Sequence, residues 1–156
     1  MKTPARVLRH PVHPMLVVFP VGLWVFSFVC DIASDAGRAE SWRLAALYSM
    51  AGGIIGALLA AFPGLADLLS LPVSRARTTG FRHLTLNLLI SMAFTVDFFM
   101  RISDRQLFWG PFFISLGSIL ALGLSAWLGG SMVYVHGVGV SAVGMGEQTK
   151  SETPRG

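Results

Sequence analysis

The side chains best suited to chemistry in this chain are its four histidines: His10, His13, His83 and His136. Imidazole nitrogens ligate haem iron and divalent metals, and imidazole also transfers protons near neutral pH. One of these histidines begins a polar row at steps of four within an apolar stretch: His83, Asn87, Ser91 and Thr95. Residues four apart lie above one another on a helix, and polar groups facing lipid are costly. We therefore expect this row to face other helices or a cavity.

A b-type haem site is the first hypothesis for the histidines. Two imidazoles from facing helices are a common way to hold haem b in a bundle. We expect His83 and His136 as axial ligands, with His13 as the substitute. Asn87 or Asp67 would orient a ring nitrogen. Arginines near the same end would neutralise the propionates: Arg9, Arg75 or Arg82. Such a protein would carry electrons between quinol, or a redox partner, and the cofactor.

Two other interpretations of the histidines stay open. Zinc or copper would accept three histidines, His13, His83 and His136, with Asp67 as the fourth ligand. Alternatively, the histidines bond helix ends and lipid headgroups, and the protein is a non-redox membrane subunit or scaffold; this is our expectation for His10. The sequence shows no nucleophile-base pair, phosphate loop or paired carboxylates, and no inverted repeat typical of a transporter. An enzymatic role is therefore left undecided.

The elements that must position these residues are apolar helices. Of 156 residues, 53% are hydrophobic and 13% charged, whereas soluble domains have roughly 25% charged residues. Four stretches are long enough to cross a bilayer: 15–32, 44–62, 83–100 and 110–134. The sequence predicts an all-α integral membrane four-helix bundle formed by residues 1–143, followed by a disordered polar tail at 144–156. The basic residues flank the spans, so we expect lipid and not nucleic acid as the partner.

Two rows of small residues predict close helix packing. The second span carries Gly52, Gly56, Ala60 and Gly64, and the fourth carries Gly117, Ala121, Ser125 and Gly129. Small residues let helix backbones approach each other in lipid, so we expect these two spans to pack together. The same rows could also serve a homodimer.

Several single residues inside the spans have more local consequences. Pro20 predicts a kink in the first span, and Pro63 with Gly64 predicts a bend or an end in the second. Asp97 and Arg101 have the i,i+4 spacing of an ion pair. We interpret Cys30, Trp24 and Trp127 as packing residues.

Charge predicts the orientation of the bundle. Eight of the twelve basic residues flank the end that would carry both termini. The positive-inside rule then places both termini on the cytoplasmic side, in a bacterial inner membrane. An even number of crossings brings all four histidines to that end. A cleaved signal peptide is the alternative for the first span, but its apolar run exceeds the usual length.

Three strings in this chain resemble a known family. They are HPMLVVFPVGLWVFS, GGIIGALLAAFPGLADLL with RHLTLNLL, and SAWLGGSMVYVHGVGV, and they cover most of the chain from His13 to Val140. In combination they are similar to the bacterial membrane proteins of domain-of-unknown-function family 2231. The resemblance implies a four-helix inner-membrane domain that some members join to Rieske-type iron-sulfur domains. This chain has a single cysteine, so an iron-sulfur partner would be a separate protein.

Overall fold

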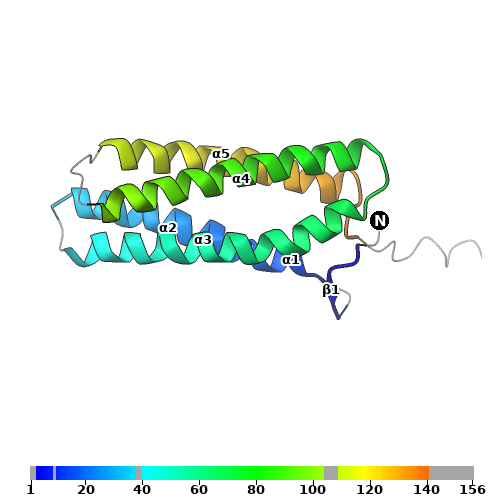
Figure 1. The fold of residues 1–156 in the computed structure, drawn as a ribbon, viewed down its shortest axis with the longest axis horizontal. Coiled ribbons are helices and arrows are strands. Elements are labelled where there is room, and N and C mark those ends of the chain that lie inside the picture. Colours follow the sequence, from blue (N-terminus) through cyan, green and yellow to red (C-terminus); the bar gives the residue numbers. More distant parts are fainter. Residues whose placement is uncertain (1–2, 9, 38–39, 104–108, 141–156) are drawn as a thin grey trace, which may run out of the picture.

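The computed structural model describes residues 3–8, 10–37, 40–103 and 109–140. The elements are two strands and five helices: β1 (Arg6–Val7), β2 (His10–Pro11), α1 (Val12–Leu16), α2 (Val18–Asp35), α3 (Glu40–Leu69), α4 (Arg75–Ile102) and α5 (Trp109–Tyr134) (Figure 1). The two-residue strands pair antiparallel and form a small N-terminal hairpin that the sequence did not predict. The expected tail at 144–156 and Arg9 lie outside the described residues.

The helical membrane architecture expected from composition is confirmed. The described residues contain four helical segments long and apolar enough to cross a membrane: Val12–Asp35, Glu40–Leu69, Arg75–Ile102 and Gly110–Tyr134. Each expected span lies inside one of these segments. Large apolar side chains on every segment point outward, as lipid-facing residues do, for example Phe19, Phe62, Met92 and Leu120.

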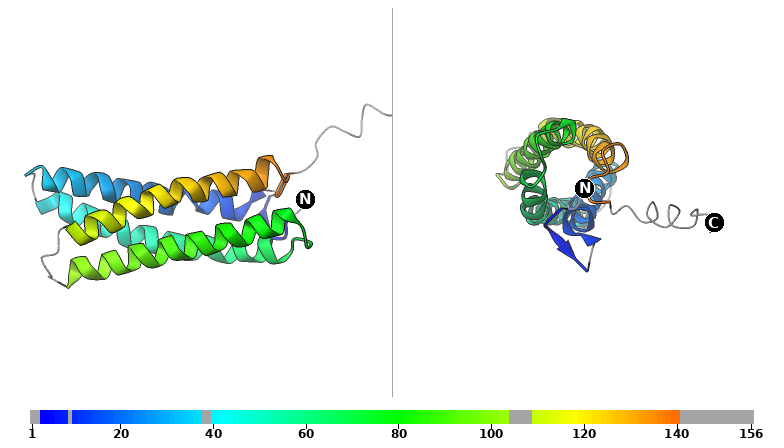
Figure 2. Two further views of the ribbon diagram at one scale, coloured as in Figure 1. Left: turned by 90° about the horizontal axis from the view of Figure 1, so that it is seen from above. Right: turned by 90° about the vertical axis from the view of Figure 1, so that its right-hand side faces the viewer.

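The four long helices form two hairpins, α2 with α3 and α4 with α5. Both hairpins start at the same end of the bundle, and the described chain also begins and ends there (Figure 1 and Figure 2). The even number of crossings therefore brings the segments before α1, at the start of α4 and after α5 to one end, as expected. The cytoplasmic placement of this end stays a prediction from charge.

The small rows pack within the hairpins, so the expected contact between the second and fourth spans is wrong. Helix α3 packs mainly on α2, and α5 mainly on α4. A Cβ built on Gly52 would meet Leu23, and one built on Gly56 would meet Pro20 at 3.1 Å. A row of small residues favours the close approach of another helix but does not determine which helix that is. In this bundle the partner is the neighbouring helix of the same hairpin.

The two prolines have different consequences for their helices. A proline ring clashes with the carbonyl four residues earlier, which for Pro20 is that of Leu16. Helix α1 ends at Leu16 and α2 begins at Val18, so the break lies where Pro20 requires it. Pro63, in contrast, lies inside α3, which continues to Leu69. Of the two outcomes expected at Pro63, a bend or an end of the second span, the end is therefore wrong.

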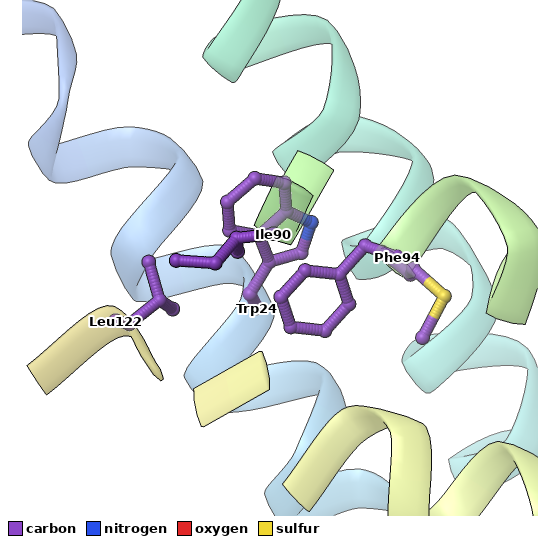
Figure 3. Close-up of a cluster of buried hydrophobic side chains, with 5 residues drawn as sticks. Trp24, Ile90, Phe94 and Leu122 are labelled. Carbon is purple, nitrogen blue, oxygen red and sulfur yellow. The ribbon is translucent and has the colours of Figure 1, made fainter. Parts of the chain in front are cut away.

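The middle of the bundle is an apolar cluster contributed by all four long helices. Trp24 from α2 stacks on Phe94 from α4, with ring centroids 4.4 Å apart. Met50, Ile90 and Leu122 complete the buried cluster (Figure 3). Cys30 is fully buried, as expected. Trp127, also interpreted as a packing residue, is 75% exposed, so its ring faces the surroundings of the bundle and not the interior.

The polar row on α4 faces the interior only in part. Steps of four advance about 400°, so such a row drifts by about 40° per step around the helix. His83 and Asn87 contact α5, but further along the buried positions are Ile90, Phe94 and Asp97. Thr95 instead donates to the carbonyl of Ser91 in its own helix at 2.7 Å. The interior face of α4 thus follows alternating steps of three and four.

An ion network joins the two hairpins at the end opposite the histidines. Arg101 donates from Nε to Asp97 at 2.9 Å, which confirms the expected pair. The same guanidinium also donates through both terminal nitrogens to Asp31 on α2. Ser115 on α5 donates to Asp97 at 2.6 Å. Three helices are therefore tied through one arginine that is largely shielded from solvent.

Replacement of Arg101 by alanine should destabilise the bundle strongly. Removing one partner of a buried ion pair leaves carboxylates without compensation and costs about 3–5 kcal/mol. The Asp97 side chain is fully buried, so its carboxylate cannot be rehydrated without opening the bundle. Thermal unfolding of the purified protein in detergent would measure the loss. Arg43→Ala removes an exposed pair with Glu40 and is the control; equal effects of both variants would contradict the assigned role.

Candidate functional site

The first histidine of the site is held by helix α3. His13 lies in α1, and its Nδ1 is 2.8 Å from the carbonyl oxygen of Ala60. The ring occupies the space left by the missing side chain of Gly64: a Cβ built there would lie 2.7 Å from His13 Nδ1. Gly64 is one turn beyond Ala60, so the carbonyl and the gap lie on the same face of α3.

The second histidine is held by helix α5 in the same way. His83 lies in α4, and its Nδ1 is 3.0 Å from the carbonyl oxygen of Ser125. A Cβ built on Gly129, one turn beyond Ser125, would lie 3.1 Å from His83 Cε1. Asn87 donates to Ser125 Oγ at 2.7 Å and to the carbonyl of His83 at 2.7 Å. The asparagine therefore links the histidine turn of α4 to α5.

These two imidazoles, one from each hairpin, lie against each other. Their ring centroids are 6.2 Å apart and the ring planes are nearly perpendicular, at 89°. The sequence predicted that the histidines share one end of the bundle, and the structure brings this pair together. It did not predict the glycine gaps or the two carbonyl acceptors. The signal was present, because a glycine follows the acceptor residue by four in both hairpins.

Three cross-hairpin contacts join positions seventy residues apart: His13 with His83, Trp24 with Phe94, and Asp31 with Arg101. In the second helices, Ala60 and Gly64 correspond to Ser125 and Gly129 at an offset of sixty-five. The two hairpins thus present equivalent positions to each other along the length of the bundle. The imidazole pair is one level of this repeated arrangement.

Hydrogen bonding determines the tautomer of both rings. A carbonyl oxygen can only accept, so Nδ1 carries the proton in His13 and in His83. With Nδ1 protonated, Nε2 is the nitrogen that carries the lone pair in the neutral form of each ring. At His83 this nitrogen is 3.2 Å from the Asn87 amide nitrogen, whose two hydrogens also have closer acceptors. Of the three contacts made by the Asn87 amide nitrogen, the one to His83 Nε2 is the longest and therefore the weakest.

Other residues expected at the site lie elsewhere. His136 follows α5 and is half-buried, and its backbone N–H donates to Ser131. Asp67 accepts from the backbone N–H of Ala5 at 2.8 Å. Arg82 is exposed, and exposed His10 contacts the carbonyl of Leu8. Thus Asp67 holds the N-terminal segment, and the interfacial role of His10 stays a prediction.

The four-ligand metal set is not assembled. Within the part of the chain that the structure describes, no group of three or more His, Cys, Asp or Glu side chains could hold a metal ion. The expectation failed because sharing one end of a bundle does not fix which side chains converge. His13 and His83 converge because each fills a gap in the neighbouring helix, whereas His136 lies beyond the end of α5.

Comparison with known proteins gives the family of this fold. The model of the predicted membrane protein family DUF2231 matches residues 9–142. The chain belongs to this family. The resemblance in the three apolar strings is thereby confirmed, and both histidines of the pair lie inside the matched DUF2231 region. No curated protein and no solved structure matches the chain.

Filling the glycine gaps should displace the imidazoles. Gly64→Ala places a methyl group against His13 and Gly129→Ala places one against His83, so we expect losses of about 1–3 kcal/mol by overpacking. Nitrogen NMR of labelled histidine should also show loss of the Nδ1 hydrogen bond. Gly123→Ala is the matched control in α5, because a Cβ there meets nothing within 4 Å. Similar losses at all three positions would show that the gaps have no special role.

Proposed function

We propose that this membrane protein binds b-type haem between His13 and His83 and carries electrons. The observation that supports the proposal is the imidazole pair. Each ring is fixed through Nδ1, and each has an Nε2 lone pair for a metal. A haem-ligating histidine is normally oriented in this way, by a hydrogen bond that its other ring nitrogen donates.

The distance between the rings suits one metal between two imidazoles. A ring nitrogen lies about 1 Å from its ring centroid and binds a metal at about 2 Å, so two opposed imidazoles have centroids roughly 6 Å apart. The separation of His13 and His83 is 6.2 Å. A pair of nitrogens without further protein ligands is the donor set of bis-histidine haem, whereas zinc prefers four protein ligands.

The residues around the pair would serve binding and orientation. The carbonyls of Ala60 and Ser125 accept hydrogen bonds from the Nδ1–H of the two rings, which raises the basicity of Nε2 in each ring. Gly64 and Gly129 let the rings lie flush against α3 and α5. When bound, haem would supply the one-electron couple. The positive-inside rule and the family resemblance favour a bacterial inner membrane, with a separate quinol or iron-sulfur protein as electron partner.

A packing role is the competing function for the same histidines. The hydrogen bond to Ala60 ties α1 to α3, and the hydrogen bond to Ser125 ties α4 to α5. Polar side chains stabilise helix contacts in lipid in this way, by about 1 kcal/mol each. In a scaffold or subunit without a cofactor, this stabilisation would be the whole purpose of His13 and His83.

Absorption spectra would separate the two functions. Protein purified from haem-supplied cells should show a Soret band and, after dithionite reduction, the sharp α band of a six-coordinate b haem. We expect His13→Ala and His83→Ala each to abolish this low-spin spectrum, since either leaves iron with one histidine. His10→Ala and His136→Ala are matched controls and should keep it. A colourless protein that stays colourless with added hemin would favour the packing role.

A further inference from the structure

The N-terminal segment before α1 lies across the end of the bundle that holds the imidazole pair. Its Ala5 N–H donates to Asp67, which lies three residues beyond Gly64 on α3. One terminal nitrogen of Arg6 donates to the carbonyl of Gly139, beyond the end of α5, at 3.0 Å. The segment therefore spans from α3 to the chain after α5, about one turn beyond the histidines.

Two polar atoms of this segment are buried without a partner. Thr3 is 6% exposed, and its hydroxyl has no hydrogen-bond partner among the described residues. Arg6 Nε is also buried and has none there either. An unpaired buried polar group costs about 1–3 kcal/mol, and more when charged. Two such atoms three residues apart indicate that a hydrogen-bonding group is missing between this segment and the bundle.

The chemistry of these atoms specifies the missing group. Arginine N–H can only donate, and a threonine hydroxyl can donate as well. A single group that bonds both atoms would have to be an acceptor, and the positive charge of Arg6 favours an anion. A carboxylate has two oxygens and accepts both hydrogen bonds. The carboxylate of Asp67 accepts from the Ala5 N–H through Oδ1, and it accepts a hydrogen bond from neither Thr3 Oγ1 nor Arg6 Nε.

We infer that Thr3 and Arg6 bind a carboxylate of the ligand held between His13 and His83. This inference rests on the proposed function, and it identifies the anionic side chains of the porphyrin as the group they receive. In this assignment Arg6 takes the role that the sequence predicted for Arg9, Arg75 or Arg82; the side chain of Arg82 is exposed and lies outside this segment. The bond from Arg6 to Gly139 fixes the guanidinium and leaves Nε for the ligand.

Porphyrins with and without free carboxylates test this assignment. Purified haem-free protein is titrated with hemin and with hemin dimethyl ester, followed by absorbance. The wild type should bind hemin more tightly than the ester. Arg6→Gln and Thr3→Val should weaken hemin binding, by roughly tenfold or more for the arginine, and leave ester binding unchanged. Arg82→Gln, an exposed arginine at the same end, should change neither.

The outcomes separate the two proposals. If the wild type binds both porphyrins equally through His13 and His83, and Arg6→Gln weakens neither, the carboxylate assignment is wrong and the haem site stands. If Arg6→Gln weakens both porphyrins alike, its role is structural and the assignment is again wrong. If the wild type binds neither porphyrin, the proposed function fails and the assignment fails with it. Circular dichroism of each variant shows whether it is folded.

Discussion

The close approach of two helices at a glycine, with an imidazole filling the space, is the contact on which the histidine end of this bundle depends. In lipid the hydrophobic effect does not drive apolar helices together, so close packing and polar contacts must stabilise the bundle. Gly64 and Gly129 remove the side chains that would keep α1 and α4 away. The vacated space is then occupied by a ring whose Nδ1–H satisfies a backbone carbonyl. Helix packing and ring orientation are thus achieved by one arrangement.

At the opposite end the hairpins are held by charge. Arg101 contacts carboxylates on α2 and α4 and the hydroxyl of Ser115 on α5. Between the two ends, Trp24 and Phe94 stack in an apolar middle. The order along the bundle is therefore polar, apolar and ionic. Large apolar side chains fill the middle of the bundle and separate the imidazole pair from the ion network at the opposite end.

Properties that depend on composition and local spacing could be predicted from the sequence. Four apolar stretches predicted the four long helices, and the i,i+4 spacing predicted the ion pair of Asp97 and Arg101. The even number of membrane crossings predicted that the histidines share one end of the bundle. Lateral packing could not be predicted. The choice of His13 over His136 depends on which helix faces which gap, and Asp31 is seventy residues from its partner. A polar row at steps of four also drifts around the helix, which is why Thr95 does not share the face of His83.

The equivalence of the two hairpins has a consequence for how such a bundle can arise. Both hairpins run in the same direction, so joining two copies of one ancestral hairpin in tandem requires no inversion in the membrane. In a dimer of identical hairpins, an aspartate at the position of Asp31 would face another aspartate. Arginine at the equivalent position in the second half turns that repulsion into attraction. The ion pair therefore makes the two halves of the chain non-equivalent, because each half supplies a different charge of the pair.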